Sequence, residues 1–228
     1  MKFINIFILL LFLSISLNCQ SITSKKVIEV DKGDLVELNR LDKQDLSNYE
    51  TAYFASGCFW CVEAIFESVK GVKEVVSGYS GGTEKDPFYE QVASGLSTHA
   101  EAVEIYYDPK VISYTALVQV FFGSHDPTSL NRQGPDRGRQ YRSVAFFKNA
   151  TEKKIISDYI SLLKSKNVYD GAPITTEVTP FKKFYKAEDY HQDYERNNPN
   201  NSYIRNVSVP RLNRFKENFG DYLKDDAH

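Results

Sequence analysis

Hydrophobic residues in the central part of the chain recur at a spacing that is typical of an amphipathic helix. Val62, Ile65, Phe66 and Val69 stand at positions i, i+3, i+4 and i+7, so they fall on one helix face. Gly71 stands where a C-terminal cap is expected, because glycine readily adopts the left-handed backbone that ends many helices. The pattern therefore predicts a helix that ends at this glycine.

The same criteria, applied to the rest of the chain, predict strands that alternate with helices. Alternating apolar positions mark residues 102–107 as a half-buried strand, which Asp108 and Pro109 end. Because the order shows no regular strand-helix-strand repeat, we expect an α+β fold: a single domain with a mixed β-sheet core and helices packed mainly on one face. The other expected elements are strands at 53–55, 73–79, 141–147 and 174–178 and helices at 87–93, 113–122 and 151–164.

A long segment, residues 124–140, interrupts this alternation. It is rich in glycine, proline, aspartate and arginine. Loops of this length inside a compact domain usually carry function, so we expect this one to form a wall of the functional site.

Near its N-terminus the chain has Lys2, followed by a nearly unbroken apolar run from Phe3 to Leu17. The run is shorter than the roughly 20 residues that span a bilayer, and it suits the core of a secretion signal. We therefore expect an exported protein, which works in the periplasm or as a membrane-anchored lipoprotein. The expected organisation is a signal peptide at 1–19, a polar linker at 20–49, a folded domain at 50–220 and a charged tail at 221–228.

Cys19 directly follows the apolar run and resembles the lipid-modified cysteine of bacterial lipoproteins. Asn18 and Ser16 depart from the usual residues of that motif. Two alternatives stay open: Cys19 carries a lipid, or it is discarded with the signal. A lipid on Cys19 is the one membrane contact that we expect.

The charges of the chain are nearly balanced. The 228 residues carry a formal net charge of −2, with a pI near 6.1, which gives no electrostatic case for binding nucleic acid or an anionic membrane surface. A hydrophobic content of 42% indicates a globular protein. We expect a monomer whose partners are small or neutral.

Two of the three cysteines, Cys58 and Cys61, lie in the run Gly57-Cys58-Phe59-Trp60-Cys61, where a strand is expected to lead into a helix. The free N–H groups of a helix N-terminus favour thiolate, so we expect Cys58 to be the ionised nucleophile. Cys61 follows by one helical turn, within reach of a disulfide after a small adjustment. From the pair alone, three interpretations stay open: a redox pair, half of a zinc site, or two packed cysteines.

Four motifs, in their order along the chain, closely resemble those of the type A peptide-methionine sulfoxide reductases, over about residues 53–219. The resemblance implies an enzyme that reduces methionine-S-sulfoxide in proteins after oxidative damage, with the free amino acid as a further candidate substrate, and that needs no cofactor and no metal. The motifs are GCFWCVE at 57–63, VSGYSGG at 76–82, THAE at 98–101 and GPDRGRQYRS at 134–143.

The resemblance also implies a role for individual residues. A sulfoxide sulfur is a poor electrophile until its oxygen is protonated or hydrogen-bonded, so the reaction needs both a thiolate and an acid. Glu101 shares a strand face with Val103 and Ile105, and we expect this apolar setting to keep its carboxyl protonated near neutral pH. The implied roles are Cys58 as nucleophile, Glu101 as acid, Tyr89 and Tyr141 as hydrogen-bond donors to the sulfoxide oxygen, Asp136 as part of the polar network, and Phe59 and Trp60 as the pocket for the substrate methyl group.

The chain departs from many relatives in its recycling cysteine, because no cysteine follows Cys61. Our hypothesis is that Cys58 becomes a sulfenic acid, and that Cys61, as the resolving cysteine, converts it to a disulfide that a thioredoxin-like donor reduces.

Two other functions compete with this hypothesis. A thiol–disulfide oxidoreductase also carries Cys-x-x-Cys at a helix start, although its tryptophan usually precedes the first cysteine. A secreted zinc-binding module would use Cys58, Cys61, His99 and His191 as ligands. Within the reductase hypothesis, we expect His191 to be structural support rather than a proton carrier.

Overall fold

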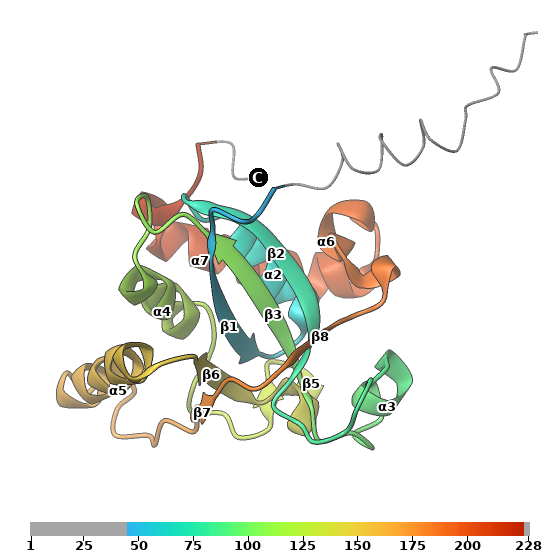
Figure 1. Ribbon diagram of the computed structural model, residues 1–228, viewed down its shortest axis with the longest axis horizontal. Helices are drawn as coiled ribbons and strands as arrows, with labels where there is room; N and C mark the ends of the chain where they lie inside the picture. Colours follow the sequence, from blue (N-terminus) through green and yellow to red (C-terminus); the bar gives the residue numbers. More distant parts are fainter. Residues whose placement is uncertain (1–44, 226–228) are drawn as a thin grey trace, which may run out of the picture. The chain divides into compact units, whose positions relative to one another are not determined.

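A computed structural model describes residues 45–225 of the chain (Figure 1). The expected signal peptide with Cys19, most of the expected linker and residues 226–228 of the expected tail lie outside the described residues. Within residues 45–225, no helix has both the length and the apolar character needed to cross a membrane.

A six-stranded sheet forms the centre of the domain, in the strand order β7-β6-β1-β3-β2-β8. β6 and β7 pair in parallel, whereas all other neighbours pair antiparallel, so the sheet is mixed as the sequence predicted. The strands are β1 (Glu50–Ser56), β2 (Val72–Ser80), β3 (Ala100–Tyr107), β6 (Ser143–Phe147), β7 (Glu177–Pro180) and β8 (Phe184–Lys186).

Two of the helices begin where a polar side chain satisfies a backbone N–H group that has no partner in the first helical turn. Ser113 accepts a hydrogen bond from the N–H of Ala116, and Asn149 accepts one from the N–H of Glu152. The helices are α2 (Phe59–Glu67), α3 (Tyr89–Ala93), α4 (Tyr114–Gly123), α5 (Ala150–Ser165), α6 (Tyr194–Asn197) and α7 (Val209–Asn218).

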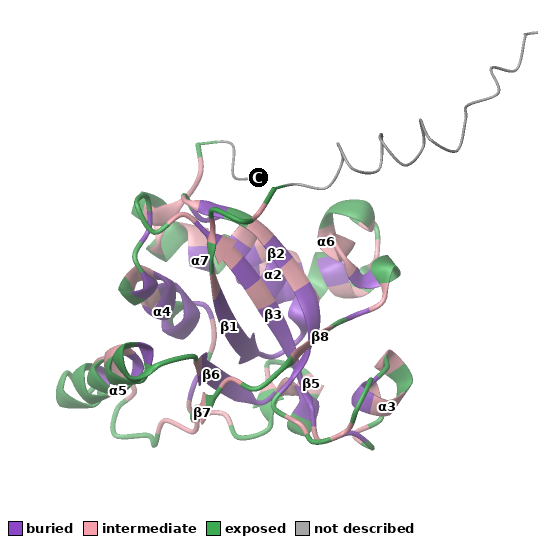
Figure 2. Cartoon of the chain, viewed as in Figure 1, coloured by how far each residue is buried: buried purple, intermediate pink, exposed green. Residues whose placement is uncertain are grey.

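The alternation of side chains along the strands separates two hydrophobic clusters. Phe54 of β1 faces the larger cluster, where its ring lies 4.7 Å from that of Phe121 in α4 and 5.6 Å from that of Phe66 in α2. Its neighbour Tyr53 faces the smaller cluster and stacks on Phe181 at 3.7 Å. Figure 2 shows the buried residues gathered along the central strands and on the helices beside them. The expectation that helices pack mainly on one face is confirmed.

Some elements differ from those that the sequence predicted. The strand expected at 174–178 is β7, at 177–180, because parallel pairing with β6 begins at Glu177. Tyr141 lies in a 3₁₀ turn before β6 rather than in the strand itself. The sequence analysis placed no element beyond residue 178, where the structure has β8, a 3₁₀ turn (Asp189–His191), α6, a π-helical turn (Ile204–Ser208), α7 and a second 3₁₀ turn (Gly220–Tyr222).

Candidate active site

Cys58 lies at the junction of β1 and α2, where it is the N-cap residue of the helix. The preceding Gly57 has a φ of +94°, and a Cβ atom there would lie 2.6 Å from the Cβ of Gln133. Only glycine fits this position. Gln133 belongs to a small hairpin, β4 (Arg132–Gln133) and β5 (Asp136–Arg137), within the long loop. The loop at 124–140 therefore contacts the start of α2.

Glu101 of β3 connects directly to the same junction. Its carboxylate oxygen Oε2 accepts a hydrogen bond of 3.0 Å from the backbone N–H of Phe59, the residue after Cys58. The side chain is buried, and burial raises the pKa of Glu101 to about 8. The direction of this shift agrees with the expectation of a protonated carboxyl near neutral pH.

The structure does not support the prediction that the N-terminus of α2 ionises Cys58. The N–H of Phe59 is directed to Glu101, and the Cys58 side chain makes no capping hydrogen bond to the helix. Cys58 is only 6% exposed, and burial, followed by its hydrogen bond to Cys61, raises its pKa. In the same pair, the hydrogen bond from Cys58 lowers the pKa of Cys61 to about 6. Within this pair the lower pKa therefore belongs to Cys61.

Trp60 and Phe59 form an aromatic cluster on the first turn of α2. The indole Nε1 of Trp60 donates a 3.1 Å hydrogen bond to Nδ1 of His191, and the indole ring stacks on Tyr194 at 3.7 Å. The His191 ring lies 5.0 Å from the Phe59 ring and 4.3 Å from the Tyr89 ring. Burial lowers the pKa of His191, so the imidazole is neutral and accepts from the indole. Its position fixes the orientation of Trp60.

Tyr89 and Tyr141 bring two phenol groups to this cluster from separate segments, the start of α3 and the 3₁₀ turn before β6. Both are half-buried. Burial raises the pKa of Tyr89 to about 12, and it raises the pKa of Tyr141 further. The negative charges that Glu101 and Cys58 carry once ionised raise the pKa of both phenols as well. Both hydroxyls therefore stay neutral, and each is an uncharged hydrogen-bond donor.

Asp136 lies on the other side of the cysteine pair, in β5 of the loop hairpin. Its Oδ2 accepts a 2.6 Å hydrogen bond from the hydroxyl of Tyr203, and that hydroxyl lies 3.8 Å from the sulfur of Cys61. Burial raises the pKa of Asp136. Asp136 thus reaches the pair through Tyr203, a residue that the sequence analysis did not identify.

Arg211 of α7 was also missed. Its side chain is buried; Nε donates to the backbone oxygen of Ser124 at 2.9 Å, and Nη2 lies 3.4 Å from the hydroxyl of Ser56. The guanidinium therefore lies under the end of β1, and its charge lowers the pKa of Cys61. An arginine in a segment of alternating polar and apolar residues gives no local sequence signal for such a position.

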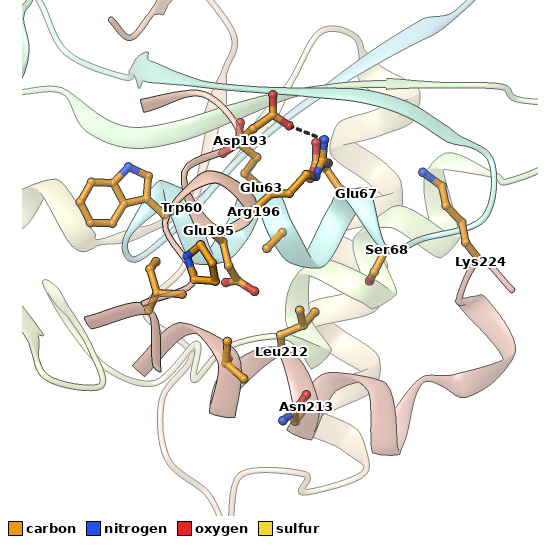
Figure 3. A pocket seen from close by; sticks show the side chains of 14 residues that line it. Trp60, Glu63, Glu67, Ser68, Asp193, Glu195, Arg196, Leu212, Asn213 and Lys224 are labelled. Atoms are coloured by element: carbon orange, nitrogen blue, oxygen red, sulfur yellow. Dashed lines mark hydrogen bonds and ion pairs between the residues drawn. The ribbon is translucent and has the colours of Figure 1, made fainter. Parts of the chain in front are cut away.

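A hollow of about 540 Å³ lies beside the cluster, between α2, α6 and the start of α7 (Figure 3). Trp60 forms part of its wall, and Arg196 bridges Glu67 at 2.8 Å and Asp193 at 3.0 Å. Neither cysteine and no side chain of β3 lines it. The catalytic groups therefore lie outside this hollow.

The four residues of the zinc alternative are not gathered. Nδ1 of His99 accepts a hydrogen bond from the N–H of Gly82, and its Nε2 lies 2.9 Å from the backbone oxygen of Glu84. Both ring nitrogens therefore contact the backbone of the loop that contains these two residues. Within the part of the chain that the structure describes, no group of three or more histidine, cysteine, aspartate or glutamate residues is placed to hold a metal ion.

Comparison with known proteins decides the family. The sequence model of the family described as "Peptide methionine sulfoxide reductase" matches residues 50–223. The chain belongs to the peptide methionine sulfoxide reductase family. It is an oxidoreductase of type A that reduces methionine sulfoxide, and neither the thiol–disulfide oxidoreductase nor the zinc module is favoured.

Two proteins named as methionine sulfoxide reductases align with this reductase over most of its length. A protein of Synechocystis named peptide methionine sulfoxide reductase MsrA 2 is 48% identical over 77% of this chain and 82% of its own length. MsrA of Deinococcus radiodurans is 46% identical over 77% of this chain and 84% of its own.

Solved structures of two reductases share the fold. Mxr1 of Saccharomyces cerevisiae in reduced form matches with a TM-score of 0.64 and 35% identity, over 70% of this chain and 91% of its own. Methionine sulfoxide reductase A of Corynebacterium diphtheriae matches with a TM-score of 0.60 and 34% identity, over 67% of this chain and 76% of its own. The α+β fold of this reductase is therefore that of its family.

Proposed function

We propose that this reductase acts on the S epimer of methionine sulfoxide, with Cys58 as nucleophile and Glu101 as acid. The observation that carries the proposal is the contact at the start of α2, where the carboxyl of Glu101 is hydrogen-bonded to the residue next to Cys58. A buried acid that holds its proton to about pH 8 lies beside a buried thiol. A sulfoxide placed between them meets both groups that its reduction requires.

The first step moves one oxygen atom and two protons. Cys58 attacks the sulfoxide sulfur, and its proton passes to the Cys61 thiolate that is already hydrogen-bonded to it. Glu101 gives its proton to the sulfoxide oxygen. The hydroxyl group then passes from the substrate sulfur to Cys58: the sulfur–oxygen bond of the substrate and the new sulfur–sulfur bond break, and an oxygen–sulfur bond to Cys58 forms. The substrate sulfur is reduced, Cys58 is oxidised to a sulfenic acid, and methionine leaves.

The aromatic residues hold the substrate for this step. Tyr89 and Tyr141 donate hydrogen bonds to the sulfoxide oxygen, and because both phenols are neutral they stabilise its developing charge without adding a competing one. Phe59 and Trp60 enclose the substrate methyl group, and the face of the indole favours the positive charge that develops on the sulfur. The S preference follows from the family likeness, since one reductase type serves each epimer.

The second step makes a disulfide between Cys58 and Cys61, which a thioredoxin-like donor then reduces. The two thiols lie three residues apart at the start of one helix, and the pKa of each is shifted by the other. Within the described residues Cys58 and Cys61 are the only cysteines, and Cys19 is the third cysteine of the sequence. Methionine sulfoxide in proteins is the main substrate, and the free amino acid is a second one.

The N-terminal sequence supports an exported enzyme. The apolar run from Phe3 to Leu17 is the core of a secretion signal, and Cys19 after it is the site of a lipid anchor. The enzyme then works as a monomer in the periplasm or on its membrane. Mass spectrometry of the mature N-terminus tests this point: an acylated Cys19 supports the anchor, and an intact Met1 contradicts export.

An epimer-resolved reductase assay tests the catalytic proposal. Wild-type enzyme with a thiol reductant should convert peptide methionine-S-sulfoxide and leave the R epimer, while Cys58→Ser should convert neither. Cys61→Ser should still release about one methionine per enzyme, more slowly because the acceptor of the Cys58 proton is lost. When thioredoxin is the reductant, turnover should then stop, because the disulfide that it reduces cannot form. Conversion of the S epimer by Cys58→Ser at the wild-type rate would overturn the proposal.

A further inference from the structure

The C-terminal part of the domain contains no cysteine, yet it packs directly against the sulfur of Cys61. Tyr203 precedes the π-helical turn, and its hydroxyl lies 3.8 Å from that sulfur. The same hydroxyl is 2.6 Å from Oδ2 of Asp136. Cys61, Tyr203 and Asp136 thus form one line of contacts, from a buried thiol to a half-buried carboxylate.

The direction of the protons along this line follows from the valence of a phenol. Tyr203 has one hydroxyl proton, and its short contact with Asp136 uses that proton. The remaining lone pairs of the phenol oxygen can then only accept, so the contact with the sulfur is a hydrogen bond from the Cys61 thiol whenever that thiol is protonated. When the thiol gives up its proton to the phenol oxygen, the phenol can pass its own proton on to Asp136.

The first reaction step creates a need for such an acceptor. In the resting pair, the hydrogen bond from Cys58 is the largest influence that keeps Cys61 ionised. Once Cys58 is a sulfenic acid, its S–H group no longer exists, and Cys61 has taken up the proton that Cys58 lost. Cys61 must lose this proton again before it can attack, because the thiolate is the nucleophile in disulfide formation.

We propose that Tyr203 and Asp136 are the proton acceptor of the resolving thiol: Tyr203 takes the proton of Cys61 and hands its own to Asp136 as the disulfide closes. This inference rests on the proposed function and assigns a role within its second step. Cys61 attacks the sulfur of the Cys58 sulfenic acid, and the disulfide bond forms as the sulfur–oxygen bond breaks. Cys61 is oxidised and the sulfenic sulfur is reduced. The leaving hydroxide takes a proton from solvent and becomes water, while Asp136 returns its proton to solvent.

The other charged and polar groups around Cys61 favour the same step. Arg211 of α7 contributes a fixed positive charge that favours thiolate at Cys61. Glu101 faces the pair from β3 and is protonated when the reaction begins. Among these neighbours, Asp136 is the carboxylate that connects to Cys61 through a hydrogen-bonded phenol. Tyr203 is therefore a catalytic residue of this step, and Asp136 acts through it.

Rapid mixing of the full-length enzyme with one equivalent of a peptide methionine-S-sulfoxide, without reductant, separates the two steps. Released methionine reports the first step, and mass spectrometry of quenched enzyme distinguishes a sulfenic acid, trapped by a 1,3-dione, from the disulfide. Tyr203→Phe keeps the ring and removes the hydroxyl. It should form the disulfide about 100-fold more slowly and slow methionine release far less, with trapped sulfenic acid accumulating.

The pH profile gives a readout that a merely structural role would not change. In Tyr203→Phe, disulfide formation should rise with pH well beyond the wild-type plateau, because hydroxide replaces the missing acceptor. Asp136→Asn is the second variant and should slow disulfide formation more than it slows methionine release. Tyr222→Phe, which removes a phenol hydroxyl bonded to Gln119 elsewhere in the C-terminal part, is the matched control and should behave as wild type.

The possible outcomes separate this inference from the proposed function. If the wild-type enzyme releases no methionine, the proposed function fails. If methionine is released and Tyr203→Phe closes the disulfide as fast as wild type, the acceptor role is wrong. Equal slowing of both steps in Tyr203→Phe and Asp136→Asn would also overturn it, because the residues would then serve the first step or the fold.

Discussion

Glu101 and Cys61 show how neighbouring side chains in one site are separated into an acid and a base. Burial raises the pKa of Glu101 to about 8, whereas the hydrogen bond from Cys58 lowers that of Cys61 to about 6. Between these two values, the carboxyl holds a proton to give and the thiolate is free to take one. The chemistry of the first step thus depends on contacts rather than on residue types alone.

The pH dependence of methionine release follows from this pair. The rate should rise with pH as Cys61 ionises near pH 6, and it should fall again as Glu101 loses its proton near pH 8. Glu101→Gln has no proton to give, so release should be about 100-fold slower and the alkaline limb should disappear. Single-turnover release measured across this range checks both effects. Glu104→Gln, on the same strand, should keep both limbs; an alkaline limb that persists in Glu101→Gln would contradict the assignment.

The motifs identified most residues that converge on the site, but they did not show which thiol carries the charge. That depends on where the N–H of Phe59 points and on what surrounds Cys61. Tyr203 is one of 15 tyrosines and lies in no recognised motif. Its importance comes from contacts with residues that lie far away in the sequence, which a single sequence does not reveal.

Elements with dense apolar periodicity were predicted well, and those held by long-range contacts were not. α2 and β3 carry their hydrophobic residues at regular spacing, and both are present as predicted, although α2 ends at Glu67 and not at Gly71. α7 is amphipathic but polar overall, and it buries only a stripe that includes Leu212 and Phe215, so few apolar residues mark it in the sequence. β8 is short and is defined by its pairing with β2, which is distant in the sequence.

On α2, the buried Glu63 couples the stability of the helix packing to pH. Burial raises its pKa from the ordinary value of 4.5 to about 8, so the folded protein binds a proton that the unfolded chain has already released. This contribution to stability is complete below about pH 4.5 and is lost as pH rises through 8.

Glu63→Gln should therefore raise the free energy of unfolding at alkaline pH, by about 2 kcal/mol relative to wild type, because a neutral amide needs no proton. The gain should shrink toward zero in mildly acidic buffer. Urea unfolding at both pH values measures the difference. The exposed Glu217→Gln, on α7, should show no such pH-dependent gain, and an equal effect of both substitutions would contradict the role of burial.

At the scale of the whole domain, the C-terminal part of the chain returns to the helices that carry the site. Arg211 donates to Ser124 at the end of α4, and a short bridge pairs Val69 with Leu223 after α2. Phe219 packs so closely on Gly123 that a Cβ atom there would lie 1.9 Å from its ring. The last described residues thus hold α2, α4 and α7 together.

Gly123→Ala should destabilise this arrangement. The added methyl group collides with the ring of Phe219, and overpacking of this kind costs about 1 to 3 kcal/mol. Chemical unfolding should show this loss, and disulfide formation should slow with it because α7 carries Arg211. Gly220→Ala, where no atom lies within 4 Å of the new group, is the control. A Gly123→Ala protein as stable as wild type would show that the tail adjusts freely.

Trp60 is the only tryptophan in the chain, and it stands between the two cysteines, stacked on Tyr194. All indole emission of the protein therefore comes from a single ring whose neighbours change with every redox step. Thiolate, sulfenic acid and disulfide each quench such a ring differently. The enzyme thus contains its own optical reporter, and its turnover can be followed in real time without a label.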